Sequence, residues 1–559
     1  MQLFQNTVHG SFGTRVKEHG SLLPVALLFF LSVVIGSIGL DHLPRNDELY
    51  TLLAARGWLI DGVPRIADGM YDRAQLYTII VAQFFGVFGE SLIVARLPSL
   101  IAGGLLVVAV FLWTRSVAGS LAAWIAALFV CLSPLNIQMS QYARFYTLFG
   151  LLFWLGAVGI YALVEKRHRW WMSLLIAAGS AVCLALAVHL QSLAMMGLIG
   201  LCVWLGLALI VPWLWSQRHR PLRLWLTTGS AAIAVIIAGG LAIQSGLAAE
   251  LWAQYRYAPL HAAPRRSIIW FYQLGLIERY PTLWPIFPFT ALLALAARPR
   301  PALFCCCVFA PAFALLSLAA MKHFNYIFFV LPFLFVIWGI SLASVIDGLW
   351  RWIMQVTDRA LAQAAPDLRR RPLTWVLIAG SLLFLVVSNG APARTLLKPF
   401  GISLQADETS NNWAPVKEAL APWLEQAAVV LTPNDLYALY YLGGYDVAVN
   451  PNLLSEMPDD AEFSLDPRTG RPVIATAASL RLLIDCYSEG LYVADEKTHP
   501  LTWGRTEELN ETIRSEMMPI DLPDQWRIFA FRWEHPEGTE QPAACASLPP
   551  SIAADLEAE

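Results

Sequence analysis

The stretch DHLPRNDELY, residues 41–50, follows directly on the first long apolar run of the chain, residues 22–40. A run of that length is about what an α-helix needs to cross a bilayer. An adjacent aspartate and glutamate, Asp47 and Glu48, therefore stand just outside a predicted membrane span. Two interpretations fit them. They occupy the first turn of a helix, where acidic side chains are favoured, or one of them removes a proton in a reaction.

The composition supports a membrane location for the rest of the chain. Of the 559 residues, 57% are hydrophobic and only 14% are charged, whereas soluble proteins have about 25% charged residues. The formal net charge of −3 gives no reason to expect a nucleic-acid partner. We therefore predict a polytopic α-helical membrane protein whose 22 tryptophans anchor at the membrane interfaces.

Eleven apolar runs are predicted as transmembrane helices. With the N-terminus in the cytoplasm, nearly every basic cluster between spans lies on the cytoplasmic side, including Arg115 and the cluster at residues 166–169. The same alternation puts the C-terminal tail on the extracytoplasmic side. The predicted spans are at about residues 22–40, 97–114, 120–134, 145–164, 171–189, 193–215, 224–243, 282–297, 302–320, 325–346 and 373–389.

One apolar run does not fit as a span. Residues 76–89 (LYTIIVAQFFGVFG) are too few to cross a bilayer and suit an interfacial or re-entrant helix. Counting this run as a span would invert every later loop and place the basic clusters outside. We therefore predict a long first extracytoplasmic loop, residues 41–96, which contains two helices at about residues 48–60 and 76–89.

The composition changes at about residue 391, where span-length apolar runs end. Helical and strand patterns alternate over residues 413–530, which indicates a soluble α/β domain. The predicted domains are thus a transmembrane part, residues 1–390, and an extracytoplasmic domain, residues 391–559, with a disordered end. Cys486 and Cys545 could form a disulfide if this domain lies outside the cytoplasm. Strand-like runs lie at residues 428–432, 446–450, 471–476, 491–496 and 526–533, helical segments at 413–426 and 434–442, and a further apolar segment at 480–484.

Several basic residues break the charge rule by lying on the predicted outer side. Each has a simple explanation by itself, such as a lipid-headgroup anchor for an arginine or a structural role for a histidine. Together they form a group of cations on the face that carries Asp47, and such a group suits a lipid-linked phosphate. The residues concerned are Arg73, Arg144, Lys322 and His323, with His189 in the turn after the fifth span.

Four segments carry a resemblance to a known family. They are NDELYTLLAARG (residues 46–57), LYTIIVAQFFGVFGESLIVARLPSLIAG (76–103), SPLNIQMSQYARFYTLFGLL (133–152) and KHFNYIFFVLPFLFVIWG (322–339). In these segments the chain resembles the GT-C superfamily of glycosyltransferases. It is most similar to the branch of dolichyl-phosphate-mannose protein mannosyltransferases and bacterial lipid A aminoarabinose transferases. The resemblance covers residues 1–390 and does not extend to the tail.

The resemblance implies roles for individual residues. Asp47 would be the catalytic base, and Glu48 would orient the acceptor or a neighbouring residue. Arg73 stands where the family has a basic residue at the donor phosphate, but Ala74 and Gln75 replace two prolines that usually follow it. The other implied contacts to donor or substrate are Tyr77, Arg144, Tyr146, His189, Lys322 and Tyr326.

The resemblance also bears on metal use. Residues 133–146 contain no acidic residue, so the second acidic motif of metal-dependent GT-C members is absent. We therefore expect no cofactor and metal-independent catalysis, with arginine and lysine in place of a cation. A divalent cation remains the alternative.

These observations predict an inverting glycosyltransferase of the bacterial inner membrane. It would move a sugar from a polyprenyl-phosphate-linked donor to an extracytoplasmic acceptor, which could be a glycolipid such as lipid A, a polysaccharide or a protein. The alternatives are a lipid or oligosaccharide transporter or flippase without transferase activity, and a non-catalytic scaffold. A transporter would normally show repeated hydropathy, and the sequence has no such repeat.

Overall fold

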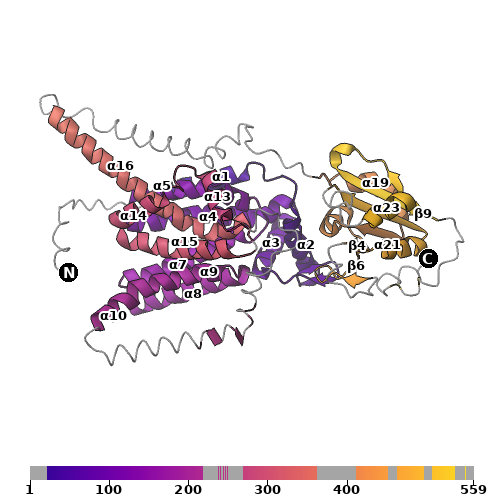
Figure 1. Cartoon of the computed structure of the whole chain (residues 1–559), viewed down its shortest axis with the longest axis horizontal. Helices are drawn as coiled ribbons and strands as arrows, with labels where there is room; N and C mark the ends of the chain where they lie inside the picture. The colour runs from indigo at the N-terminus through magenta and orange to yellow at the C-terminus, as the bar shows by residue number, and fades with distance from the viewer. Residues whose placement is uncertain are drawn as a thin grey trace.

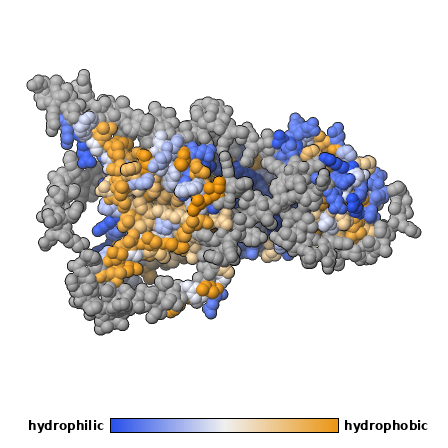
Figure 2. All heavy atoms as spheres, viewed as in Figure 1, coloured by the Kyte–Doolittle hydropathy of each residue, from blue (hydrophilic) through white to orange (hydrophobic). Residues whose placement is uncertain are grey.

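A bundle of long helices and a smaller α/β domain make up the two ends of the molecule. The helices α2 (Asn46–Asp61) and α3 (Gln75–Phe88) lie between them (Figure 1). The computed structural model describes residues 22–217, 268–320, 322–361, 411–450, 463–496 and 507–535, with single positions between residues 237 and 249 and at Cys545 and Leu548. Apolar surface covers much of the helical bundle and hydrophilic surface gathers on the α/β domain (Figure 2).

The helical bundle identifies the chain as a polytopic membrane protein. Within the described residues, six helices are long and apolar enough to cross a membrane. They are α4 (Leu92–Ala118), α7 (Tyr146–Glu165), α8 (Trp170–Leu190), the continuous segment of α9 (Ala194–Leu205), η1 (Gly206–Ile210) and α10 (Val211–Gln217), α15 (Pro299–Leu318), and η3 (Phe324–Val330) with α16 (Leu331–Leu361).

A seventh span exists if a bent pair of helices is counted as one. The helices α5 (Ser120–Cys131) and α6 (Pro134–Ser140) meet at an angle of 57°. Proline lacks the N–H that would continue the hydrogen bonds of α5, so Pro134 begins a new helix in a new direction. The bend starts the turn that carries Arg144.

The prediction of eleven spans is not confirmed. The helices α1 (Leu23–Ser37) and α14 (Phe287–Ala297) lie in predicted spans but have only 15 and 11 residues. The apolar run before α14 is interrupted by prolines, which stop a helix from extending through it. Two predicted spans, residues 224–243 and 373–389, lie outside the described residues.

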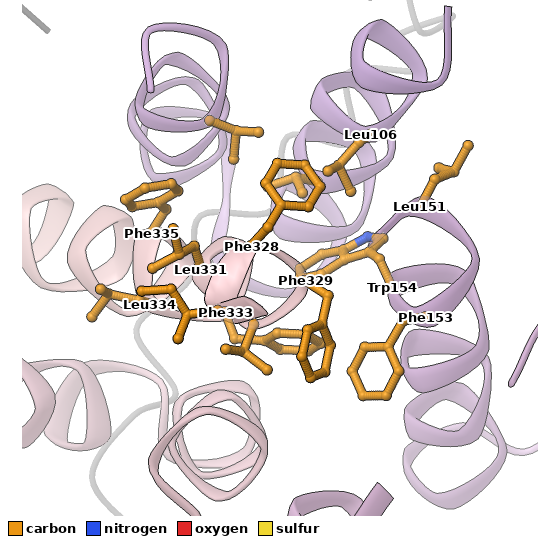
Figure 3. Close-up of a cluster of buried hydrophobic side chains, with 14 of the residues drawn as sticks. Leu106, Leu151, Phe153, Trp154, Phe328, Phe329, Leu331, Phe333, Leu334 and Phe335 are labelled. Carbon is orange, nitrogen blue, oxygen red and sulfur yellow. The ribbon is translucent and has the colours of Figure 1, made fainter. Parts of the chain in front are cut away.

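Aromatic side chains from separate helices fill the centre of the bundle. Phe333 of α16 and Trp154 of α7 have ring centroids 4.7 Å apart, and Phe328 and Phe329 lie on the same side of the bundle (Figure 3). A Cβ at Gly150 of α7 would come within 2.7 Å of the Phe328 ring, so glycine allows this close approach. The packed centre gives the polar end of the bundle a rigid base.

Residues 41–96, predicted as the first outer loop and called the outer loop below, contain the two predicted helices, and both helices are confirmed. The helix α2 (Asn46–Asp61) begins within the acidic stretch, and α3 (Gln75–Phe88) coincides with the short apolar run. A short antiparallel hairpin of β1 (Arg65–Ile66) and β2 (Gly69–Met70) lies between them. This hairpin was not predicted, because its strands have only two residues each.

The C-terminal part forms a seven-stranded sheet in the order β5-β6-β4-β3-β7-β9-β8. Its four central strands are parallel, and the strands at both edges pair antiparallel. The α/β architecture agrees with the sequence prediction. The strands are β3 (Val429–Thr432), β4 (Val447–Val449), β5 (Ser464–Leu465), β6 (Pro472–Ile474), β7 (Glu489–Asp495), β8 (Met518–Ile520) and β9 (Ile528–Glu534).

Short helices cover this sheet. The apolar segment at residues 480–484 lies in a helix, which begins where the Thr476 hydroxyl accepts a hydrogen bond from the Ser479 N–H. Cys486 and Cys545 form a disulfide. The end predicted to be disordered, the last dozen residues, lies outside the described residues except for Leu548, which is buried. The helical segments are α19 (Val416–Gln426), α20 (Asp435–Tyr437), η5 (Ala438–Leu442), α21 (Ala477–Cys486), α23 (Glu507–Glu516) and η7 (Asp524–Trp526).

The outer loop and the C-terminal domain share one hydrophobic core. Leu49 and Leu53 of α2 and Ile66 of β1 are buried in the same cluster as Trp413 and Leu436 of the domain. Tyr437 of the domain also donates a hydrogen bond to the Pro44 carbonyl at 3.2 Å. The domain is therefore docked on the outer loop, directly beside the acidic stretch.

Candidate active site

A pocket of about 590 Å³ opens where the outer loop, the α6–α7 turn and the C-terminal domain meet. Three residues singled out from the sequence, Asp47, Arg73 and Arg144, line it together. The structure thus brings a carboxylate and two cations from three separate segments into one place. The remaining lining residues are Tyr50, Met70, Tyr71, Asp72, Pro467 and Arg468.

Asp47 lies in the first turn of α2 and is exposed to the pocket. An acidic side chain at this position interacts favourably with the partial positive charge of the helix N-terminus. Its carboxylate makes no hydrogen bond or ion pair with another residue that the structure describes. It is therefore open to a ligand, as a proton acceptor must be.

Glu48, the next residue, is fully buried and has a different environment. Its two carboxylate oxygens accept hydrogen bonds from Nε and Nη2 of Arg96, both at 2.8 Å. The carboxylate also accepts from the backbone N–H of Ala143 at 2.8 Å and of Arg45 at 3.0 Å. All of these contacts are internal, which suits the supporting role expected for Glu48.

Arg96 extends this network to the end of α1. Its Nη1 donates to the carbonyls of Leu40 at 2.6 Å and His42 at 2.8 Å. One buried ion pair thus joins α2, α4, the α1–α2 connection and the α6–α7 turn. Because all four segments meet at the first turn of α2, the pair fixes the position of Asp47.

His42 responds to the same arginine. Partial burial of its ring and the positive charge of Arg96 lower the pKa of His42 from 6.5 to about 4. The ring is therefore neutral at pH 7, and its Nδ1 lies 2.9 Å from Nη1 of Arg96. Protonation would place a second cation beside the arginine.

This pKa predicts a dependence of stability on pH. Between pH 6.5 and about 4 the unfolded chain binds more protons at His42 than the folded chain does. The His42 contribution to stability is therefore lost as the pH falls through this window and is constant above it. We expect the melting temperature of His42→Gln to depend less on pH between these values than that of the wild type. Parallel curves for the two proteins would contradict the assignment.

Arg144 is a buried cation with spare hydrogen-bonding capacity. Only 3% of its surface is exposed, and its Nη1 donates to the Tyr71 hydroxyl at 2.8 Å. Its Nε has no hydrogen-bond partner, and no carboxylate among the described residues lies within ion-pair distance of it. A buried guanidinium in this condition favours an anionic ligand in the pocket.

Arg73 lies in a locally unusual backbone. Ala74, which follows it and caps α3, has a φ of 53° in the left-handed region. Proline is restricted to a φ near −65°, so it could not occupy this position. Where the family has a proline after the basic residue, this chain thus has an alanine in a left-handed conformation that proline cannot adopt. Arg73 still lines the pocket.

Tyr77 supports the pocket from below and does not line it. Its buried hydroxyl lies 2.6 Å from Oγ of Ser99, and that serine donates to the Arg144 carbonyl at 2.8 Å. Tyr77 therefore helps to hold the backbone of Arg144.

The other predicted contacts also lie outside the pocket lining. Tyr146 is buried and stacks on Tyr142, with ring centroids 6.4 Å apart. Tyr326 lies in η3, a segment that packs against α6 and α7. Nζ of the buried Lys322 donates to the Ala319 carbonyl, and His189 is exposed in the last turn of α8. Their roles stay predictions.

Several residues of the pocket lining and of the network behind it were missed in the sequence. Arg96 had a signal, because it interrupts an apolar run of the outer loop. Tyr50, Tyr71 and Asp72 lay within the stretches singled out but had no distinguishing property. Arg468 had no signal at all, since it lies in an ordinary polar turn of the C-terminal domain.

Metal use is not decided by these residues. Within the described part of the chain, no group of three or more histidine, cysteine, aspartate or glutamate side chains is arranged to hold a metal ion. Metal-independent catalysis stays a prediction.

Comparison with solved structures identifies the fold. ArnT from Cupriavidus metallidurans bound to undecaprenyl phosphate matches over 92% of this chain and 98% of that chain, with a TM-score of 0.58 and 16% sequence identity. The archaeal oligosaccharyltransferase AglB from Archaeoglobus fulgidus, in complex with an inhibitory peptide and a dolichol-phosphate, matches over 89% of this chain and 72% of that chain. Its TM-score is 0.55 and its identity 12%. No protein-family model and no curated protein matches the chain.

Both similar structures are GT-C superfamily members. The chain therefore has the GT-C fold, as the motifs of its membrane part predicted.

Proposed function

We propose that the protein is a glycosyltransferase that moves a sugar from a polyprenyl-phosphate-linked donor to a hydroxyl group of an extracytoplasmic acceptor. One observation carries the proposal: the open carboxylate of Asp47 shares a pocket with the buried, incompletely bonded guanidinium of Arg144. The GT-C fold supports it, since ArnT was solved with undecaprenyl phosphate and AglB with a dolichol-phosphate.

The two arginines suit the leaving group. Arg144 and Arg73 would pair with the phosphate of the donor, whose negative charge increases as the glycosidic C–O bond breaks. Positive charge already in place needs no reorganisation at that moment. Tyr146, Tyr326, Lys322 and His189 remain the predicted contacts to the rest of the donor.

Asp47 suits the acceptor. Its carboxylate would take the proton of the acceptor hydroxyl while that oxygen attacks the anomeric carbon. The bond between the acceptor oxygen and the anomeric carbon forms as the bond from that carbon to the phosphate oxygen breaks. The electron pair of the broken bond leaves with the polyprenyl phosphate. A phosphate leaves without protonation, so the second carboxylate used by glycosidases is not required.

A single displacement of this kind inverts the anomeric configuration. Retention would need a carboxylate nucleophile and a covalent intermediate. Glu48 cannot act in this way, because both of its oxygens are bound to Arg96. Exclusion of Glu48 as a nucleophile supports the inversion that we predict from the sequence.

Two observations support a periplasmic location for the reaction. Arg300 and Glu165, at loops predicted to be cytoplasmic, form an ion pair at 3.2 Å. The pocket lies beside the C-terminal domain, and the Cys486–Cys545 disulfide suits an oxidising compartment. We place the reaction on the periplasmic side of an inner membrane.

The transporter alternative is not favoured. The charged groups of the pocket lie in loops and helix ends at one face, whereas a transporter binds its substrate near the bilayer midplane. The proposed acceptor is a glycolipid, a polysaccharide or a protein that carries a free hydroxyl group.

The direct test is release of labelled sugar from a polyprenyl-phosphate donor by the purified protein, with a solubilised cell-envelope extract as the source of acceptors. We expect an extract-dependent labelled product of inverted configuration. Absence of both transfer and donor hydrolysis would overturn the proposal.

Binding of undecaprenyl phosphate tests the role of Arg144 separately. Arg144→Ala should weaken binding by about 1.5–3 kcal/mol, roughly 10- to 150-fold in Kd, the usual range for a hydrogen bond to a charged group. Arg144→Lys should recover only part of the lost affinity, because lysine lacks the planar guanidinium group that can donate two parallel hydrogen bonds to a phosphate. Arg45→Ala is the matched control, since Arg45 is an exposed cation beside Tyr142 that does not line the pocket. Equal loss in both alanine variants would indicate general electrostatic attraction.

A further inference from the structure

Arg468 is the basic residue that the C-terminal domain contributes to the pocket lining. It lies 2.9 Å from Asp435 through Nη2, and its Nε donates to Asp466 at 2.9 Å. Its Nη1 donates to the Tyr50 hydroxyl on α2. Two carboxylates thus neutralise Arg468, whereas Arg144 has no carboxylate partner among the described residues. The two arginines therefore have different tasks.

Tyr50 connects Arg468 to the catalytic side of the pocket. It lies three residues after Asp47 on α2, so the two side chains share one face of the helix. Its ring stacks on Tyr71 with centroids 5.5 Å apart and planes 9° apart. The Tyr71 hydroxyl in turn accepts from Arg144. A continuous series of contacts runs from the C-terminal domain to the proposed phosphate site.

The loop that carries Arg468 is held tightly against the outer loop. The Thr469 carbonyl accepts from the backbone N–H groups of Asp68 and Gly69 at 2.9 and 2.8 Å. A Cβ at Gly69 would come within 2.5 Å of the Arg468 carbonyl oxygen, and one at Gly470, whose φ is 70°, within 2.7 Å of Asp68. This close backbone contact fixes where Arg468 stands relative to α2.

We propose that Arg468 is a positioning residue: it holds Tyr50 in place and so allows the C-terminal domain to complete the acceptor side of the pocket. The proposal rests on the proposed transferase function. The donor phosphate is assigned to Arg73 and Arg144, on the side of the membrane helices. The acceptor hydroxyl must reach Asp47 from the remaining side, which Tyr50, Pro467 and Arg468 form.

The test compares Arg468→Ala and Arg468→Lys with the control Arg481→Ala. Arg481 is matched to Arg468, since the side chains of both are 44% exposed and both form ion pairs with acidic residues of the same domain. Three quantities are measured: amide hydrogen exchange of residues 46–50 and 65–71, Kd for undecaprenyl phosphate, and KM for acceptor in a solubilised cell-envelope extract titrated by its lipid content.

We expect Arg468→Ala to raise the acceptor KM by about 10-fold, as for loss of a hydrogen bond to a charged group. Exchange at residues 46–50 and 65–71 should become faster, while the Kd for undecaprenyl phosphate changes by less than about twofold. Arg468→Lys should raise the acceptor KM by less than Arg468→Ala does. Arg481→Ala should match the wild type in hydrogen exchange, in Kd and in acceptor KM.

Two results would overturn the positioning role. One is an Arg468→Ala protein with unchanged exchange and acceptor KM. The other is faster exchange throughout the C-terminal domain with loss of undecaprenyl phosphate binding, which would make Arg468 a residue of the general fold. If the wild type shows neither transfer nor hydrolysis, the proposed function fails, and the exchange pattern alone decides whether Arg468 positions Tyr50.

Discussion

Asp47→Asn is expected to lower kcat by about 10²- to 10⁴-fold, the usual contribution of a general base. Asparagine has nearly the same shape but cannot accept the proton of the acceptor hydroxyl. The side chain is exposed at a helix N-terminus and makes no contact that folding depends on. Undecaprenyl phosphate should therefore bind as it does to the wild type, and the melting temperature should be nearly unchanged.

Asp72→Asn is the matched control for this prediction. Asp72 is the other exposed carboxylate of the pocket lining, and the substitution makes the same change in charge. We expect it to keep most of the wild-type kcat, because Asp72 is not on α2 beside the proposed acceptor path. If Asp47→Asn keeps its activity while Asp72→Asn loses it, the base is Asp72.

The second large effect is expected at the Glu48–Arg96 ion pair. Glu48→Ala should reduce the free energy of unfolding by about 3–5 kcal/mol, because it leaves the Arg96 charge buried without its partner. Both side chains are 0% exposed, so water cannot replace the missing carboxylate. The backbone N–H groups of Ala143 and Arg45 lose their acceptor as well. Thermal denaturation of the detergent-purified protein measures the effect.

A double-mutant cycle separates the pair from its surroundings. The double variant Glu48→Ala/Arg96→Ala should be less destabilised than the sum of the two single variants, since each single change already removes the same interaction. The exposed pair of Arg56 and Glu90, which also involves α2, provides the control. Its side chains are 35% exposed, and breaking it should cost about 0–1 kcal/mol. Equal costs for both pairs would show that burial does not strengthen the Glu48 interaction.

Much of the fold could be predicted because it depends on local properties. The apolar runs that lie within the described residues contain helices, the short run at residues 76–89 became α3, and the alternating tail became an α/β sheet. Helix lengths were less predictable, since residues 282–297 contain prolines that shorten α14. The short strands of the β1–β2 hairpin had no pattern long enough to read.

The candidate site was predictable only in part. Arg73 and Arg144 stood out as positive charges on the predicted outer side, where positive charge is scarce. Asp47 stood out because it belongs to an acidic pair just after the first apolar run. Tyr77 and Tyr146 carried the family resemblance but proved to lie outside the pocket lining. The residues that line the pocket differ from these two tyrosines in the direction of their side chains. The sequence does not reveal which side chains face a cavity.

The sequence by itself determined that this is a membrane protein with an acidic pair at the end of its first predicted span, because hydropathy, helix length and charge placement are properties of short segments. The GT-C fold was implied by the resemblance of four motifs and not by these properties. Only the tertiary structure decided that the two acidic side chains have different environments. Asp47 is open, whereas Glu48 is bound to Arg96, 48 residues away. It also decided that Arg468, from the far end of the chain, faces the same pocket. Burial and pairing of charges depend on which distant segments meet, and that is set by the packing of the whole chain.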